Sequence, residues 1–189
     1  MTSDNPVASR SAEPGAVARV VPGRECSTCT LCCKLIAVNE LGKPPGTWCP
    51  HCIRGTGCGI YETRPAECRT FFCHWMLEKG LTAEWKPERA KFALVTGEGG
   101  NLTVFVDPGF PGAWRNAPYF ETLKRWSLEG ARAAPVRIIM VRIGTRGIVV
   151  LPDREADIGD VGPHTAIRLE PGRAGRIEVR KFERDSSAE

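Results

Sequence analysis

Nine cysteines, spaced as metal ligands are, form the part of this sequence best suited to chemistry. A gap of two residues lets two sulfurs reach one zinc ion at a distance of about 2.3 Å, and the same gap serves iron–sulfur clusters. The sequence therefore predicts a thiolate metal site, with zinc favoured and iron or an iron–sulfur cluster as the alternative. The expected ligands are Cys26, Cys29, Cys32, Cys33, Cys49, Cys52, Cys58, Cys68 and Cys73.

Nine thiols exceed the four ligands that one tetrahedral zinc ion takes. Two sites, or one cluster with additional structural thiols, are therefore expected. If residues 26–33 were helical, a rotation of about 100° per residue would put Cys26, Cys29 and Cys33 on one face. Cys32 would then point elsewhere. The adjacent Cys32 and Cys33 should thus serve two different ions, or one should be a ligand and the other a spare thiol.

Two histidines and several basic residues accompany the cysteines. His51 stands between Cys49 and Cys52, where it either supplies a nitrogen ligand or only occupies the turn. His74 is expected to be an ordinary helix residue, packed or exposed. The positive side chains near the cysteines could offset the negative charge of the thiolates. They are Lys34, Arg54, Arg64 and Arg69.

Composition restricts the class of protein. The chain has 189 residues, 42% of them hydrophobic and 25% charged, which is typical of a folded domain with an apolar core. A net charge of +4 is too small to indicate a nucleic-acid partner. Neither a secretory signal nor an apolar run long enough for a membrane helix is visible. We expect the protein to be cytoplasmic, where clustered thiols act as ligands rather than as disulfides.

The chain divides into three parts by composition. Residues 1–23 are expected to form a disordered leader, and residues 24–80 a cysteine-rich metal-binding module. Residues 81–189 are expected to form a small α+β region. The fold class predicted is therefore α+β, with an irregular cysteine-rich module packed on a small domain that contains β-hairpins and one amphipathic helix.

Hydrophobic patterns and turn residues predict the individual elements. One helix is expected over residues 63–79, with Thr63 as its N-cap, and an amphipathic helix over residues 119–128. The predicted strands form two hairpins, followed by two further strands. They cover residues 91–96 with 102–107, residues 136–143 with 147–151, and residues 167–169 and 177–182.

Two motifs resemble a known family. The run Cys26-x2-Cys29-x2-Cys32-Cys33, followed by Cys58-Gly-Ile-Tyr-Glu-Thr-Arg-Pro-Ala-Glu-Cys68-Arg-Thr-Phe, is similar to the two blocks of the CxxCxxCC family, the YkgJ-type zinc- or iron-chelating domain. The resemblance covers residues 24–79. It implies a metal site but no particular activity. The implied ligands are Cys26, Cys29, Cys32, Cys33, Cys58 and Cys68, with Cys49 as the intervening cysteine and with Cys52 and Cys73 as features of a subgroup.

Several functions remain open from the sequence. No catalytic constellation is visible beyond the ligands, so a metal-binding protein is the first hypothesis, and whether the protein is an enzyme is undecided. An iron–sulfur protein with a redox or protein-modifying role is the second hypothesis. A zinc-stabilised protein or nucleic-acid interaction module is the third, although nucleic acid is disfavoured because acidic residues alternate with the arginines of residues 168–184. A protein partner would bind through the C-terminal region. A fourth hypothesis is that Cys32 or Cys33 is a redox-sensing thiol activated by Lys34.

Overall fold

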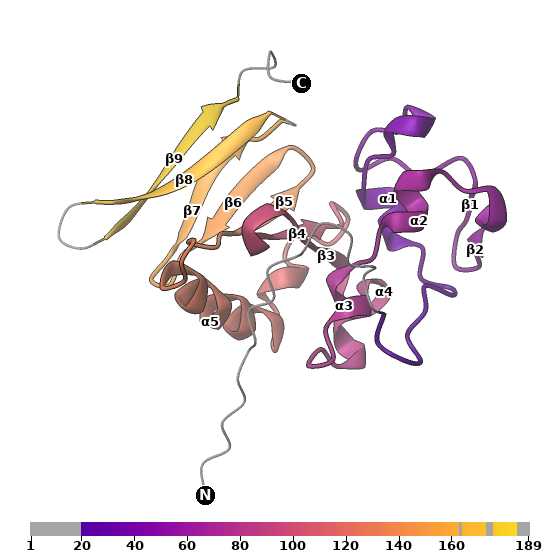
Figure 1. Cartoon of the computed structure of the whole chain (residues 1–189), viewed down its shortest axis with the longest axis horizontal. Helices are drawn as coiled ribbons and strands as arrows, with labels where there is room; N and C mark the ends of the chain where they lie inside the picture. The colour runs from indigo at the N-terminus through magenta and orange to yellow at the C-terminus, as the bar shows by residue number, and fades with distance from the viewer. Residues whose placement is uncertain (1–19, 163, 173–175, 185–189) are drawn as a thin grey trace, which may run out of the picture.

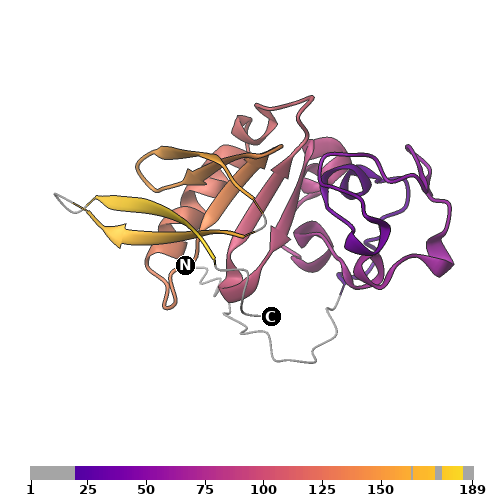
Figure 2. The same ribbon diagram turned by 90° about the horizontal axis from the view of Figure 1, so that it is seen from above.

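The protein has an α+β fold in which a cysteine-rich module lies beside a mixed β-sheet. The computed structural model describes residues 20–162, 164–172 and 176–184. Figure 1 shows the module in indigo and magenta, next to the first strands of the sheet. The C-terminal strands, in orange and yellow, lie farther away, and in Figure 2 the module and the last hairpin occupy opposite ends of the molecule.

Five strands form the main sheet, in the order β3-β4-β5-β6-β7. All neighbouring pairs are antiparallel except β4 and β5, which run parallel. A parallel pair needs a crossover connection, and the chain supplies it through helix α5 (Tyr119–Ala131). The strands are β3 (Phe92–Thr96), β4 (Leu102–Val106), β5 (Ile139–Ile143), β6 (Arg146–Val150) and β7 (Glu155–Asp160).

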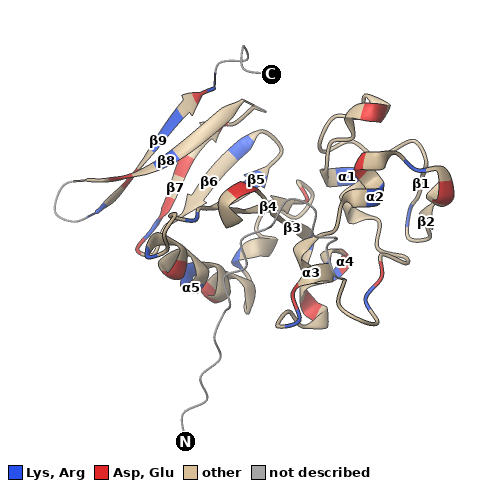
Figure 3. Cartoon of the chain, viewed as in Figure 1, with Lys and Arg blue, Asp and Glu red and all other residues tan. Residues whose placement is uncertain are grey.

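A separate hairpin ends the described chain. It consists of β8 (Thr165–Pro171) and β9 (Ile177–Glu183), paired antiparallel. Both signs of charge are distributed over β7, β8 and β9 in Figure 3. Arg180, for example, lies 3.3 Å from Glu170 and 3.6 Å from Glu178. The arginines of this region are therefore accompanied by carboxylates, as their alternation in the sequence indicates.

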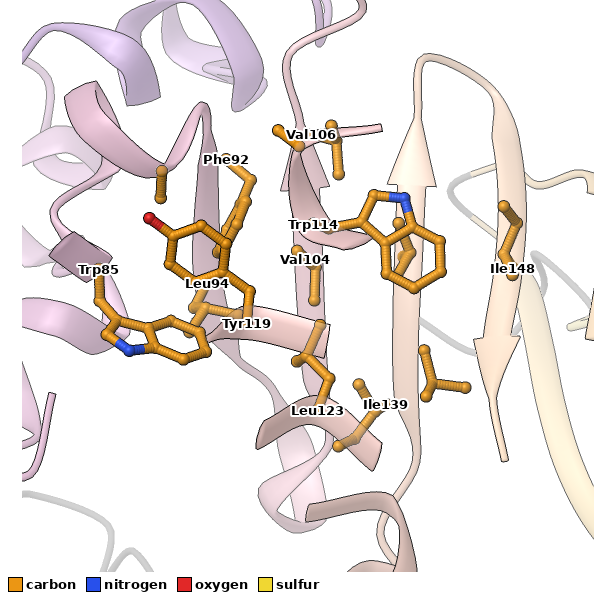
Figure 4. Close-up of a cluster of buried hydrophobic side chains, with 14 of the residues drawn as sticks. Trp85, Phe92, Leu94, Val104, Val106, Trp114, Tyr119, Leu123, Ile139 and Ile148 are labelled. Atoms are coloured by element: carbon orange, nitrogen blue, oxygen red, sulfur yellow. The ribbon is translucent and has the colours of Figure 1, made fainter. Parts of the chain in front are cut away.

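The main core lies between the sheet and α5. Successive residues of a strand point to opposite faces, so Phe92 and Leu94 face α5 while Ala93 faces away. Leu123 of α5 is fully buried against them, as is Trp114 from the short 3-10 helix η5 (Ala113–Arg115). Figure 4 shows these side chains interleaved with those of β4, β5 and β6. This packing makes the C-terminal region a domain with its own hydrophobic core.

The module packs on the other face of the sheet at β3 and β4. Leu31 and Leu35, from helix α1 (Leu31–Leu35), pack on Ala93 and Phe105. Lys34 of the same helix forms an ion pair of 2.6 Å with the buried Asp107 at the end of β4. Module and sheet are therefore joined by an apolar contact and by an ion pair.

Short elements build the module and its junction with the sheet. Glycine and proline interrupt the chain often, so few turns of helix propagate. The elements are η1 (Asn39–Leu41), β1 (Cys52–Ile53), β2 (Gly57–Cys58), η2 (Tyr61–Thr63), α2 (Ala66–Thr70), α3 (His74–Leu77), η3 (Ala83–Trp85) and α4 (Pro87–Ala90), with η4 (Glu98–Gly100) in the β3–β4 loop.

The single helix predicted over residues 63–79 is wrong. The chain forms α2 and α3 instead, with residues 71–73 extended between them, and Phe71 has φ −79° and ψ 124°. Pro65, not Thr63, is the N-cap of α2. The helix is interrupted at a run of residues with low helix propensity, Thr70, Phe71 and Phe72. It gives Cys68 and Cys73 independent directions.

The remaining predicted elements agree with the structure in their central residues and differ only at their ends. Both hairpins, the helix at residue 119 and the last two strands are confirmed, although α5 continues to Ala131. Strand β7 was missed, since three of its six residues are acidic and one is glycine, all of them types that are depleted in strands. Of the leader expected at residues 1–23, residues 1–19 lie outside the described residues. Val21 donates a backbone hydrogen bond of 2.8 Å to Met76, so the described chain is held to α3 from its beginning. Within the described part of the chain, no helix has the length and apolar character needed to cross a bilayer.

Candidate metal centre

The nine cysteines are all free thiols, and they fall into two sets. One set lines a cavity of about 20 Å³ at the junction of the module with the sheet domain. We call its members the cavity thiols: Cys26, Cys29, Cys32 and Cys73. The other set surrounds the small β1–β2 hairpin. We call its members the hairpin thiols: Cys33, Cys49, Cys52, Cys58 and Cys68.

Three local structures bring the cavity thiols together. A turn closes between Cys26 and Cys29, whose N–H donates to the Cys26 carbonyl at 2.7 Å. Cys32 lies in the first turn of α1. Cys73 is the N-cap residue of α3 and the only buried cysteine of the nine. Since α3 packs on the sheet domain through Trp75, the cavity combines thiols from two segments that are far apart in the sequence.

The cavity has a mixed lining beyond the thiols. Phe71, Trp75 and Met76 supply apolar surface, while Lys86 and Glu25 supply charge. Apolar side chains at such a place lower the local dielectric and strengthen the interaction between thiolates and a cation. Phe71, Trp75 and Met76 therefore shield one side of the cavity thiols.

The hairpin thiols are positioned by backbone pairing. Cys52 and Cys58 are directly opposite partners in the β1–β2 pair. Cys49 donates a backbone hydrogen bond of 2.9 Å to Cys33, which ties the hairpin to α1. Cys68 comes from α2, and negative charge on Cys33, Cys49 and Cys58 raises the pKa of its thiol, after the larger effect of burial. These mutual effects place the five sulfurs near one another.

Burial makes most of these thiols weak acids. It raises the pKa of Cys26 and of Cys29, and it raises the pKa of Cys73 to about 11. Burial and the neighbouring Cys33 thiolate raise the pKa of Cys52 to about 11. Metal ligands must be deprotonated, so a bound cation would have to compensate for this unfavourable charge. Thiols whose pKa is raised in this way lose their protons more easily beside a bound cation than without one.

Cys33 is the exception. The neighbouring Cys32 thiol lowers the pKa of Cys33 to about 6, and the pKa of Cys32 is in turn raised well above its usual value. The Cys52 thiol also lowers the pKa of Cys33. Cys33 is therefore the sulfur at which the two sets meet.

The basic residues beside the thiols agree only in part with those expected, since Arg64 acts on Cys26 but two lysines that were not expected act on the thiols as well. Lys34 is paired with Asp107, so it does not serve as a counter-charge for the thiolates. Lys43 takes that place, because its pKa is affected by Cys49, Cys33, Cys32 and Cys68 after the larger effect of burial. Lys86 acts likewise on Cys26 and Cys29. Neither lysine was singled out from the sequence, and neither belongs to a motif that would have revealed it.

The thiols gather without forming a finished coordination site. In residues 20–162, 164–172 and 176–184, no group of three or more Cys, His, Asp or Glu side chains is arranged so that it could hold a metal ion. The donor chemistry of each set nevertheless fits a thiophilic ion, since each offers at least four sulfurs. Binding would require the sulfurs to move inward from the positions described.

The expected helical grouping of Cys26, Cys29 and Cys33 is wrong. Helix α1 begins only at Leu31, so Cys26 and Cys29 precede it in a turn. Cys32, not Cys33, joins them at the cavity. The expectation that adjacent Cys32 and Cys33 separate is compatible with this arrangement.

The histidines have different surroundings. His74 packs edge-on against Trp126 at a centroid distance of 6.2 Å, and its Nδ1 lies 2.9 Å from the Thr96 hydroxyl. His74 is therefore an ordinary packed helix residue, as expected. The His51 carbonyl accepts a hydrogen bond of 2.9 Å from Gly59, which closes the hairpin turn. This bond gives the backbone of His51 a structural role whatever its ring does.

The aromatic and basic residues of the second motif lie outside the thiol sets. Tyr61 is 52% exposed, so it is not a core residue. Arg64 stacks on its ring at 3.7 Å and donates to its carbonyl at 2.6 Å. The Glu67 carboxylate accepts hydrogen bonds from Asn39. Arg64 still lowers the pKa of Cys26 slightly, against the larger effect of burial.

Comparison with known proteins identifies no relative. No model of a known protein family, no curated protein and no solved structure matches the chain.

Proposed function

We propose that this protein binds two metal ions, one through the cavity thiols and one through the hairpin thiols, with zinc favoured over iron. Residues 24–79 would then be a domain of the CxxCxxCC type, as their two motifs indicate. The observation that carries the proposal is the division of nine free thiols into sets of four and five.

The numbers of sulfurs match what zinc requires. A closed structural zinc site takes four ligands in a tetrahedron, and both sets can supply them. The cavity set has no surplus, while the hairpin set has one thiol more than it needs. Cys33 is the natural surplus thiol or shared ligand, because its sulfur contacts both Cys32 and Cys52.

An iron–sulfur cluster is the second candidate, favoured by one feature of the cavity. Phe71, Trp75 and Met76 border its four thiols. Four cysteines with apolar surroundings also suit a cluster, whose potential depends on exclusion of water. An iron–sulfur cluster would imply a redox or protein-modifying role, whereas closed zinc sites support a structural role.

The test is metal analysis of the full chain purified without oxygen. An absorption spectrum, elemental analysis and native mass spectrometry on one sample should give two zinc ions per chain and no visible colour. Several irons with labile sulfide and a brown colour would establish the second candidate instead. A folded chain that takes up neither metal would contradict the proposal, because neither thiol set would then bind an ion.

We also propose that the protein acts in the cytoplasm, since nine free cysteines are best preserved in a reducing compartment. A protein partner would bind through residues 81–189. Cell fractionation tests the location. Cross-linking of the full chain to its partners, with the cross-linked sites mapped by mass spectrometry, tests the binding surface. Cross-links confined to residues 24–80 would contradict binding through residues 81–189.

A further inference from the structure

A second cavity lies where the module meets the sheet, away from the cavity thiols. It also has a volume of about 20 Å³. Its walls come from two segments of the module and from strands β4 and β5. They include Leu35, Pro45, Phe105, Val106, Pro108 and Arg142. Arg142 is the one charged side chain of this lining, among the residues that the structure describes.

The Arg142 guanidinium is only partly satisfied. Its Nη2 donates a hydrogen bond of 3.0 Å to the Val161 carbonyl. Its Nε is buried and has no hydrogen-bond partner within the described chain. No carboxylate of the described residues lies within 4.0 Å of it, whereas the neighbouring Arg146 is paired with Asp157. Arg142 therefore brings an unpaired positive charge to the wall of the cavity.

Nothing else in the cavity compensates for this charge. The Phe105 ring lies 5.7 Å from the guanidinium carbon, which gives a weak cation–π contact. The nearest carboxylate in the sequence, Asp107, already accepts from Lys34 and from the Gly109 N–H. Burial accordingly lowers the pKa of Arg142. The Arg142 side chain is half-buried, so its charge keeps only part of its hydration, and an anion in the cavity would supply the partner that the described residues do not.

We propose that this cavity binds the oxyanion group of a small ligand, a carboxylate or a phosphate, through the Arg142 guanidinium. The planar guanidinium presents parallel N–H donors that match two oxygens of such a group. Only the oxyanion group fits a space of about 20 Å³, so the rest of the ligand extends toward solvent between module and sheet. The site is independent of metal binding by the thiols.

The Nε–H signal of Arg142 in a nitrogen-resolved NMR spectrum provides a direct test. The full chain is titrated with inorganic phosphate and, in a separate arm, with acetate, at constant ionic strength in chloride. We expect a saturable shift of this signal with a dissociation constant of about 1 mM or tighter in at least one arm. The arm that saturates identifies the oxyanion.

Two variants complete the test. Arg142→Gln, followed through the backbone amide signal of Gly144 at the same cavity, should weaken binding about tenfold or more, because the charge-assisted hydrogen bonds are lost. Arg146→Gln, on the adjacent strand and already paired with Asp157, should leave the affinity unchanged. Should Arg142→Gln not fold, Arg142→Lys and the wild-type Nε–H signal carry the same comparison. Absence of saturation in both arms, or equal losses in the two glutamine variants, would overturn the proposal.

Discussion

Cys32 and Cys33 are neighbours in the chain, yet their sulfurs belong to different thiol sets and shift each other's pKa in opposite directions. Cys32 lines the cavity with Cys26, Cys29 and Cys73. The pKa of Cys33 is also lowered by Cys52 of the hairpin. Adjacent residues of a helix point about 100° apart, so the first turn of α1 can direct one sulfur to each set. This turn is the structural link between the two proposed sites.

The first prediction concerns metal content. Cys73→Ser leaves three thiols in the cavity set, and the double substitution Cys58→Ser with Cys68→Ser leaves three thiols in the hairpin set. Each variant should bind one zinc ion instead of two, because a serine hydroxyl is a poor zinc ligand. Elemental analysis and native mass spectrometry measure the stoichiometry, and circular dichroism checks that each variant folds. If either folded variant loses both ions, the two sets are not separate sites.

The second prediction concerns thiol reactivity in the metal-free protein. With a pKa of about 6, Cys33 is mostly thiolate at pH 7, whereas Cys52 and Cys73, at about 11, are mostly protonated. Iodoacetamide should modify Cys33 tenfold to about a hundredfold faster than either, after allowance for the weaker nucleophilicity of a low-pKa thiolate. The rate should fall about tenfold from pH 7 to pH 5, as the thiolate takes up a proton.

Peptide mass mapping over time measures these rates. Cys33→Ser is the control, since it should abolish the fast modification and so distinguish Cys33 from Cys32 in the same peptide. A fast phase that persists in this variant, or that does not change between the two pH values, would contradict the assignment.

The third prediction concerns the attachment of the N-terminal segment. The Arg24 guanidinium donates to the carbonyls of Trp75, Glu78 and Leu81 and lies 4.8 Å from the Trp75 ring centroid. Arg24→Ala should lower the free energy of unfolding by about 2 kcal/mol, because these charged hydrogen bonds are lost together. Denaturant titration followed by tryptophan fluorescence measures this change.

Arg125→Ala is the matched control for Arg24. The Arg125 side chain is 66% exposed, and its ion pair with Glu129 is long, at 4.0 Å. The loss of Arg125 should therefore change the free energy of unfolding by less than about 0.5 kcal/mol. Equal effects of the two substitutions would show that the bonds of Arg24 do not stabilise the fold.

The fourth prediction concerns the packing of α5 on the chain that enters β5. A Cβ added at Gly130 would lie 2.6 Å from the backbone oxygen of Arg137. Alanine normally stabilises a helix, but a backbone oxygen cannot move aside as a flexible side chain can. Gly130→Ala should therefore destabilise the protein by about 1–3 kcal/mol.

Gly112→Ala is the control for Gly130, because nothing lies within 4 Å of the added Cβ and the φ angle is −93°. It should leave stability unchanged or raise it by up to about 1 kcal/mol. Thermal unfolding of both variants, followed by circular dichroism, tests the pair. A Gly130→Ala protein as stable as the wild type would contradict the close approach.

The sequence by itself was enough to predict the α+β class and most elements of the sheet domain. The short β-favouring apolar runs of β3 and β4, and the helical spacing in α5, are local features that a single sequence contains. The cysteine spacing likewise indicated a thiolate-rich module. The parallel pairing of β4 with β5 was not predicted, because it depends on a crossover that brings distant segments together.

Only the tertiary structure decided how the thiols divide. Cys73 joins Cys26 and Cys29 because α3 docks on the sheet, and no local pattern encodes that contact. The break between α2 and α3 sends Cys68 and Cys73 to different sets, where a continuous helix would have kept them on one axis. Lys43 and Lys86 reach the thiols by the same long-range packing. Residue types and spacing thus determined the chemistry that is available, whereas the packing of distant segments determined which groups share a site.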